Sequence, residues 1–163
     1  MISRYAVFRQ RAADEWRDIR RAADKAQQAF QLAGRGGKDE TFYLDSTALN
    51  LHGFYNGVEQ LFEWIAKEFD GTVPSGSVWH RQLLAQMQLA VPTVCPAVIR
   101  PTTRGALEKY LGFRHIVRNL YTGDFDAKRL AELIESLPPM LADLRADLEQ
   151  FREFLDEAGH ADE

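Results

Sequence analysis

The sequence predicts an all-α protein, an up-and-down helical bundle of four long helices with one or two short ones. Apolar residues recur at steps of three and four along most of the chain, and no segment alternates apolar and polar residues as a half-buried strand does. With 163 residues, 45% of them hydrophobic and 27% charged, the chain is long enough to bury a core. We therefore expect a single domain over 1–163, with a frayed tail at 159–163.

Two long helices come first, over 3–33 and about 41–70. The first lacks proline and glycine and is rich in Ala, Arg and Gln, which favour helix. The glycines of GRGGK at 34–38 end it, because glycine readily adopts the left-handed conformation that closes a helix. The second helix has the clearest apolar stripe of the chain. It consists of Leu44, Ala48, Leu51, Tyr55, Val58, Phe62, Ile65 and Phe69.

A short helix and an extended connection follow. The turn cluster DGTVPSGS ends at Ser77, a residue type that favours the N-cap, so we predict a helix over 77–89. The prolines of VPTVCPAVIRP at 91–101 forbid helix and predict an extended connection. Thr102 or Thr103 is then expected to cap a long helix that runs to about residue 121.

The last helical run is expected to begin at Asp126, a favourable cap, and to continue to the acidic end of the chain. Pro138 and Pro139 interrupt this run, because proline lacks the N–H of the helical ladder and clashes with the preceding turn. We predict a kink there, or a restart in which Ser136 is the cap and the prolines occupy the first turn.

The charge of the chain is unevenly distributed. The net charge of −4 excludes a general nucleic-acid coating protein, so any contact with nucleic acid has to come from a local basic segment. The segment 100–121 fits that description, since it contains five Lys or Arg and Glu108 as its single acidic residue.

Several cofactor classes are excluded by composition. The single cysteine, Cys95, excludes a disulfide framework and a thiolate zinc cluster. GRGGK at 34–38 lacks the preceding strand and the following Ser or Thr of a phosphate-binding loop. Glu157-x-x-His160 is a single copy of a motif that a di-metal bundle needs on two helices. We expect neither a metal nor a cofactor.

The chain is also predicted to be cytoplasmic. Its N-terminal segment MISRYAVFRQRAADEW has no apolar core of signal-peptide length. The longest mainly apolar stretch, 89–99, covers about half of a membrane span and contains prolines. We therefore expect no membrane-spanning segment.

The densest group of chemically capable side chains lies in GFRHIVRNLY. On a helix Arg114, Arg118 and Tyr121 share one face, and His115 and Asn119 share the adjoining one. Guanidinium groups bind phosphate oxygens and keep their charge, while imidazole is the usual general acid or base near neutral pH. These groups suit phosphodiester cleavage, and RNA brings its own 2′-hydroxyl nucleophile, so the reaction needs no metal.

Two structural alternatives stay open for these arginines. The helix could be a basic face that is exposed to solvent. Alternatively, Arg114 or Arg118 could pair internally with an acid such as Glu59 or Glu63. His80, which stands at the start of a predicted helix, is interpreted as a packed or capping histidine.

The segment resembles the motif of HepT-like ribonucleases, a family of the HEPN superfamily. That motif has Gly-Phe-Arg, a polar residue, three or so further residues, a histidine, one residue and a tyrosine. Here GFR at 112–114 and Tyr121 match it, His115 takes the polar position, and Asn119 stands where the motif has its histidine. The stretches YNGVEQLFEWIA and WHRQLLAQM are also similar, and the resemblance covers roughly 41–157.

The resemblance implies a HEPN-like helical homodimer whose composite cleft forms where the motif helices of two subunits meet. Members of the family are often metal-independent endoribonucleases that act as toxins beside a small nucleotidyltransferase antitoxin. In some of them the antitoxin modifies the motif tyrosine with nucleotide, so Tyr121 is the implied modification site. The implied function is a toxin-like endoribonuclease of a toxin–antitoxin system, with RNA and the nucleotidyltransferase as its partners.

Asn119 changes what such a site is expected to do, because an amide cannot transfer a proton as imidazole does. His115 lies one helical turn back and is our candidate for proton transfer, so the enzyme is expected to be attenuated. Arg114 is expected to hold the scissile phosphate and Asn119 to orient the substrate, while Arg118 and Tyr121 bind it. The alternative is a catalytically inactive HEPN protein that docks the nucleotidyltransferase, a nucleotide or RNA.

Overall fold

The computed structural model describes residues 4–119 and 126–161 and confirms the all-α bundle. Its five α-helices are α1 (Arg4–Ala33), α2 (Glu40–Ile65), α3 (Trp79–Gln88), α4 (Pro101–Asn119) and α5 (Ala127–Ala161). Near the end of α4 the structure gives only the backbone of four residues, which are His115, Ile116, Arg118 and Asn119.

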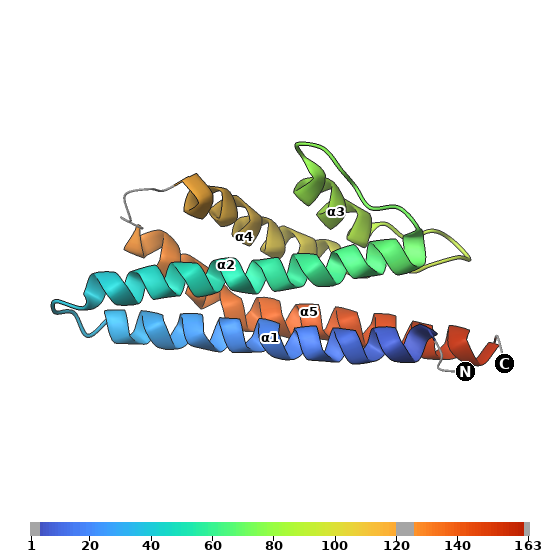
Figure 1. Cartoon of the computed structure of the whole chain (residues 1–163), viewed down its shortest axis with the longest axis horizontal. Helices are drawn as coiled ribbons and strands as arrows, with labels where there is room; N and C mark the ends of the chain where they lie inside the picture. The colour runs from blue at the N-terminus through green and yellow to red at the C-terminus, as the bar shows by residue number, and fades with distance from the viewer. Residues whose placement is uncertain (1–3, 120–125, 162–163) are drawn as a thin grey trace.

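The four long helices alternate in direction along one axis, as the predicted up-and-down topology requires (Figure 1). In Figure 1, α1 and α2 form an antiparallel hairpin, α5 crosses behind them, and α3 and α4 lie on the other side of α2. The start of α1 and the end of α5 lie at the same end of the bundle, where Arg9 pairs with Asp156 at 2.5 Å. Because α2 has neighbours on several sides, it forms the centre of the molecule.

The central position of α2 explains why more of its surface is buried than the predicted stripe contains. Leu51 and Val58 of that stripe are fully buried, but so are Phe54 and Leu61, which lie outside it. Phe54 meets the ring of Tyr110 from α4 edge-on, with the ring centroids 5.5 Å apart. A second apolar face therefore packs α2 against the helix that carries the motif.

The hairpin of α1 and α2 depends on a glycine where the two helices approach closely. A Cβ atom added at Gly57 would stand 2.8 Å from Cγ1 of Ile19, a contact that real structures do not show. Ile19 is itself buried, with 1% of its surface exposed. Only glycine lets the backbone of α2 come this near to α1 without displacing that side chain.

The predicted second helix extends to residue 70, but its last turn changes type. After α2, residues Ala66–Asp70 form a π-helical turn, and Gly71 closes it in the left-handed conformation with φ 69°. The cap predicted for the next helix is wrong. Val78, not Ser77, is the N-cap of α3, and no side chain caps that helix. The backbone carbonyl of Gly76 accepts from the N–H of Trp79 instead.

The connection before α4 is non-helical, as predicted, but it is not extended throughout, because residues 91–95 form a turn in which Thr93 has φ 67°. The N–H groups of Val98 and Ile99 both donate to the carbonyl of Met87, at 2.8 and 3.1 Å, and so fasten the connection to the end of α3. Val91 and Cys95 form an isolated antiparallel bridge. The connection thus returns the chain to α3 before α4 starts.

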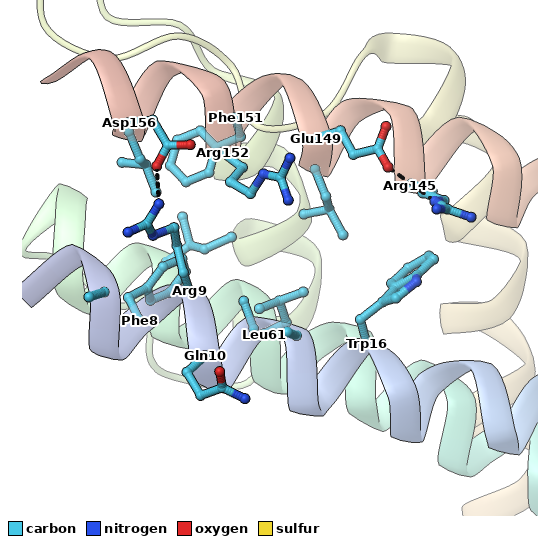
Figure 2. Close-up of a pocket in the computed structure, with 16 residues that line it drawn as sticks. Phe8, Arg9, Gln10, Trp16, Leu61, Arg145, Glu149, Phe151, Arg152 and Asp156 are labelled. Carbon is cyan, nitrogen blue, oxygen red and sulfur yellow. Dashed lines mark hydrogen bonds and ion pairs between the residues drawn. The ribbon is translucent and has the colours of Figure 1, made fainter. Parts of the chain in front are cut away.

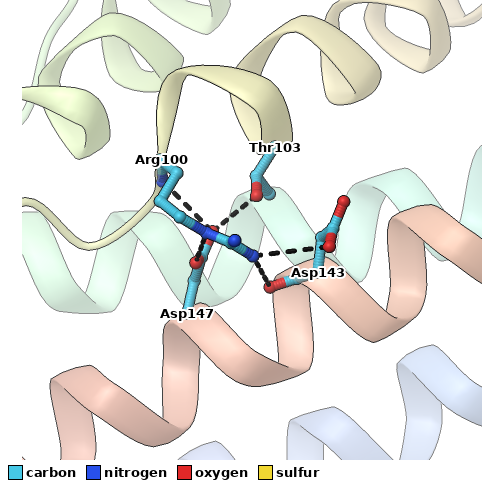
Figure 3. A network of polar contacts seen from close by, with 4 residues as sticks. All are labelled: Arg100, Thr103, Asp143 and Asp147. Atoms are coloured by element: carbon cyan, nitrogen blue, oxygen red, sulfur yellow. Dashed lines mark hydrogen bonds and ion pairs between the residues drawn. The ribbon is translucent and has the colours of Figure 1, made fainter.

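The beginning of α4 differs from the threonine cap that the sequence suggested. The helix already begins at Pro101, and the N–H of Arg104 donates to the carbonyl of Arg100. Thr103 therefore lies within the first turn, where its hydroxyl donates to the buried carboxylate of Asp147 on α5 at 2.5 Å (Figure 3).

The last helix begins as predicted and then continues without the predicted restart. The carboxylate of Asp126 accepts from the N–H of Lys128 at 3.0 Å, which confirms the cap. α5 runs through Pro138 and Pro139 without a break, so a restart there is wrong. The hydroxyl of Ser136 donates to the carbonyl of Glu132 at 2.6 Å and thus bonds back into the helix.

Packing explains why α5 survives its two prolines. Leu137, Met140 and Leu141 flank the prolines and are buried, so burial of this apolar face offsets the loss of two ladder hydrogen bonds. α5 is helical as far as Ala161, and the last two residues of the tail that was expected to fray lie outside the described chain, so the fraying stays a prediction. In the described parts, no helix combines the length and apolar character needed to cross a membrane.

Candidate functional site

Arg114 lies on the side of α4 that faces α2, and its side chain is largely buried, with 13% exposed. Its Nη1 atom stands 3.2 Å from Oε1 of Glu59. The sequence left two structural alternatives for Arg114, an exposed basic face and an internal ion pair. The structure shows the internal ion pair. Glu59 is also buried, with 6% of its side chain exposed, so this is not a weak surface ion pair.

A third group completes the site. His80, in the first turn of α3, places Nδ1 2.7 Å from Oε2 of Glu59, and 11% of its side chain is exposed. The indole of Trp79 lies against the imidazole, with the ring centroids 3.6 Å apart. Glu59, His80 and Arg114, which we call the α2–α3–α4 triad, thus join three helices that are separate in the sequence.

The contact with Glu59 places a hydrogen on Nδ1 of His80. A carboxylate accepts only, so Nδ1 of His80 donates its N–H to Oε2 of Glu59. Nη1 of Arg114 stands 2.6 Å from Nδ1 and 2.8 Å from Nε2, so it lies against the imidazole and is in line with the lone pair of neither nitrogen.

The triad leaves hydrogen-bonding capacity unused. The Nε atom of Arg114 is buried and has no acceptor among the described residues. Each polar contact that the described residues make with Arg114 involves Nη1, so Nη2, which is not enclosed as Nε is, keeps its hydrogens for an incoming acceptor. A buried donor without a partner is costly, and such a group is typical of a site where a ligand supplies the missing acceptor.

Burial and the charge of Glu59 influence the neighbouring acids. Burial, and then the negative charge of Glu59, raises the pKa of Tyr55 above its ordinary range. The same two causes, in the same order, raise the pKa of Glu63, one turn further along α2. The surroundings of the triad therefore disfavour additional negative charge on α2.

The motif residues beyond Arg114 are only partly described. The backbone of His115, Arg118 and Asn119 is helical at the end of α4, but their side chains are not described. Tyr121 lies outside the described residues altogether. The predicted roles of these four residues stay predictions.

Sequence reasoning missed His80 as a member of the site. Glu59 was considered only as a possible partner for an arginine, and His80 only as a packing or capping residue. The two are 21 residues apart, and His80 is 34 residues from Arg114. No local pattern predicts these contacts, because they depend on how α3 folds back onto α2.

Other candidate chemistry in the described chain is sparse. Among the described residues, no group of three or more His, Cys, Asp or Glu is placed to hold a metal ion. Burial raises the pKa of the Cys95 thiol, which disfavours the reactive thiolate.

A separate hollow of about 700 Å³ opens between α1, α2 and α5 (Figure 2). Phe8, Leu61 and Phe151 are among the apolar residues of its wall, and Figure 2 shows Arg9 reaching across to Asp156 at its rim. The hollow contains none of the three triad residues and none of the motif residues.

The region that contains the triad is similar to a known protein family. A family model described as "HepT-like protein" matches residues 46–155, which is more than half of the chain. The match runs from within α2 to within α5 and includes Glu59, His80 and Arg114. No curated protein and no solved structure matches the chain.

Proposed function

The chain belongs to the HepT-like family of HEPN proteins, and on that premise we propose that it is a metal-independent endoribonuclease, the toxin-like member of a toxin–antitoxin pair. Arg114 holds the scissile phosphate, and Arg118 steers the RNA backbone. His115 transfers a proton and Asn119 orients the substrate. The protein acts in the cytoplasm as a homodimer, in which the motif helices of two subunits form the cleft.

The observation that supports this proposal is the unused donor capacity of Arg114. Glu59 fixes the guanidinium through Nη1 and leaves Nη2 for phosphate oxygens. An arginine that is held in place before substrate arrives stabilises developing charge without reorganising during the reaction. The ion pair with Glu59 thus fits a positioned phosphate-binding arginine.

RNA cleavage by the purified protein in the presence of EDTA tests the proposal. The wild type should produce a 2′,3′-cyclic phosphate end, and Arg114→Ala should lower kcat by about two to three orders of magnitude. Arg104→Ala is the matched control, because Arg104 lies on the same helix in an exposed pair with Glu108. Equal losses in both variants would reduce Arg114 to a general contributor of positive charge.

His115→Ala tests the proton-transfer role in the same assay. We expect a loss of about two to four orders of magnitude in rate. If the wild type cleaves RNA and His115→Ala cleaves it equally well, His115 is not the proton-transfer residue.

The second candidate function is a non-catalytic HEPN protein, and Asn119 favours it because an amide cannot replace the motif imidazole. In that case the wild type does not cleave RNA but binds the nucleotidyltransferase partner or RNA. Co-expression with a small nucleotidyltransferase from the neighbouring gene provides the test. Intact-mass measurement should then show one or more added nucleotides that Tyr121→Phe abolishes.

The composite cleft requires a dimer, so the oligomeric state tests the mechanism independently of activity. Light scattering at micromolar concentration should give twice the chain mass. A monomer under these conditions would remove a cleft that is shared between subunits.

A further inference from the structure

The hollow between α1, α2 and α5 has an apolar floor. Its buried residues, none of them more than 9% exposed, are Phe8, Leu61, Ile65, Phe151 and Leu155. The α1 side carries short side chains, those of Ala6, Ala12 and Ala13, which leave the space toward α5 unfilled. The volume of about 700 Å³ is in the range of sites that hold small organic molecules. An apolar wall gives water few hydrogen-bond partners, so the hollow suits an apolar ligand better than it suits water.

One large aromatic side chain of α1 also faces this space. The indole of Trp16 is half-buried and projects from α1 toward α5 (Figure 2). On α5, Leu148 lines the hollow and is likewise half-buried. An indole offers a large flat surface to an apolar group that enters. The apolar body of a ligand thus finds contacts on both helices.

The rim of the hollow carries one positive charge more than it neutralises. Arg9 pairs with Asp156 at 2.5 Å, and Arg145 pairs with Glu149 at 3.1 Å. Arg152 stands between these two pairs, and the described residues give it neither an ion pair nor a hydrogen bond (Figure 2). Three arginines against two carboxylates leave a net charge of +1 on this rim.

Helical spacing explains why Arg152 has no partner in the described parts of the chain. Side chains three and four residues apart on a helix are neighbours. For Arg152 these neighbours are two apolar residues, Leu148 and Leu155, and two acids, Glu149 and Asp156, that already hold the other arginines. α5 therefore offers this guanidinium no carboxylate at helical spacing that is not already paired. An anion from outside the chain is the acceptor that fits.

We propose that this hollow is a binding site for an amphipathic organic anion. The apolar body of the ligand lies between Trp16 and the buried floor, and its single carboxylate accepts from the guanidinium of Arg152. A second negative charge on the ligand is disfavoured, because Glu149 and Asp156 flank Arg152 on the rim.

The site is separate from the proposed ribonuclease centre. Its α1 side precedes residues 46–155, the part of the chain that matches the family model. Its wall contains none of the motif residues. The inference therefore goes beyond the proposed ribonuclease function and does not depend on it.

Calorimetric titration of the full-length protein with decanoate, below the concentration at which decanoate forms micelles, tests the site. Decanol, which has the same number of carbon atoms and no charge, is the comparison ligand. We expect one decanoate to bind per chain, about tenfold tighter than decanol, because only the carboxylate forms an ion pair with Arg152.

Arg152→Met tests whether one side chain causes the preference for the anion. Methionine keeps an apolar stem and removes the charge, so decanoate should lose about tenfold in affinity while decanol binds as it does to the wild type. Arg11→Met is the matched control, because Arg11 is an exposed arginine of α1 that does not line the hollow. It should leave both affinities unchanged.

The fluorescence of Trp16 reports where the ligand lies. Decanoate should change the tryptophan emission of the wild type, because the indole lines the hollow. Trp16→Phe should lose that change while calorimetry still detects binding. Unfolding curves establish that each variant folds.

Binding of decanoate that depends on Arg152 and is reported by Trp16 supports the site. The inference is overturned if decanoate does not bind, if decanoate and decanol bind equally, or if the emission change persists in Trp16→Phe. It is also overturned if Arg11→Met costs as much affinity as Arg152→Met.

Light scattering with and without decanoate tests a different occupant. If decanoate converts a dimer into monomers, the hollow is an interface between two copies of the chain, which overturns the small-molecule site. None of these results changes the outcome of the RNA cleavage assay, so the two proposals can fail separately.

Discussion

Two arginines meet a buried carboxylate in different ways: Arg100, immediately before α4, and Arg114, within it. At the start of the helix, Asp147 accepts from the backbone N–H of Arg100 at 3.1 Å, from Nε of Arg100 at 2.5 Å and from the hydroxyl of Thr103 at 2.5 Å (Figure 3). Asp147 is nearly inaccessible, with 2% of its side chain exposed, whereas half of the Arg100 side chain faces solvent. This carboxylate is well satisfied, and its contacts fasten α4 to α5.

Fourteen residues later the arrangement is reversed. Arg114 is itself buried, its carboxylate Glu59 is shared with His80, and its Nε atom has no acceptor among the described residues. The contacts of Asp147 are satisfied, whereas the buried Nε of Arg114 has no acceptor among the described residues and so carries an energetic cost. The first pair therefore fastens α4 to α5, whereas the second leaves a buried donor without an acceptor in the described parts of the chain, as the proposed phosphate-binding role requires.

The largest expected effect comes from removing the saturated carboxylate. Asp147→Ala leaves three donors without their acceptor, among them the buried hydroxyl of Thr103, and should lower the free energy of unfolding by about 3 kcal/mol. Chemical denaturation measures the loss. Asp143→Ala, one turn earlier on α5, is the matched control, because Asp143 is about half exposed and should contribute under about 1 kcal/mol. If both substitutions lowered the free energy of unfolding equally, the pair of Arg100 and Asp147 would have no special structural role.

A smaller loss of stability is expected at the unsaturated pair. Glu59→Gln retains one acceptor oxygen but leaves the guanidinium of Arg114 buried without an opposite charge, so unfolding should become easier by about 2 kcal/mol. Denaturation of the variant measures this cost. Glu108→Gln breaks only the exposed pair with Arg104 and should cost under about 0.5 kcal/mol. If Glu59→Gln lost as much stability as Asp147→Ala, Glu59 and Asp147 would contribute equally to the stability of the fold.

Local patterns predicted most of this fold. The apolar periodicity placed all four long helices, and the cap at Asp126 could be predicted because its carboxylate and the N–H that donates to it are two residues apart. The predicted restart at Ser136 is wrong because it depends on contacts between residues that are distant in the sequence. Whether a helix tolerates Pro138 and Pro139 depends on the packing of neighbouring buried residues, which is set by other helices.

The sequence predicted the candidate site less completely than it predicted the fold. Arg114 was found through the motif, and its pairing with Glu59 was one of the alternatives considered. His80 was not found, because its contacts require α3 to return to α2 after a turn that contains proline and glycine. Periodicity determines which face of a helix is buried, but it does not determine which helix covers that face.

Between the two pairs, Tyr110 provides a neutral tie from α4 to α5, in addition to the contacts of Asp147. Its hydroxyl donates to the carbonyl of Leu133 at 2.7 Å, so Tyr110→Phe should lower the free energy of unfolding by about 1 kcal/mol at pH 7. Burial raises the pKa of Tyr110 above its ordinary range. The unfolded tyrosine therefore ionises first, and the stability of the wild type should fall as the pH rises above about 10.

Denaturation at several pH values between neutral and alkaline checks this prediction. Tyr110→Phe should show a shallower alkaline loss than the wild type, because one of the tyrosines with a raised pKa is gone. Some loss should persist, since burial also raises the pKa of Tyr55. An unchanged alkaline slope in Tyr110→Phe would mean that the tie is not coupled to ionisation.

The smallest effect is expected at Glu63, next to the unsaturated pair. Burial and then Glu59 raise the pKa of Glu63, so the folded state holds this proton more tightly than the unfolded chain does. That contribution is fully present below the unfolded pKa of about 4.3 and is lost as the pH rises through the folded pKa. At pH 7 the charge therefore opposes folding slightly, and Glu63→Gln should be more stable than the wild type by under about 0.5 kcal/mol. The gain should disappear when both proteins are denatured at acid pH. If Glu63→Gln remained more stable than the wild type at acid pH, the gain would arise from packing. The negative charge of Glu63 would then not destabilise the folded state.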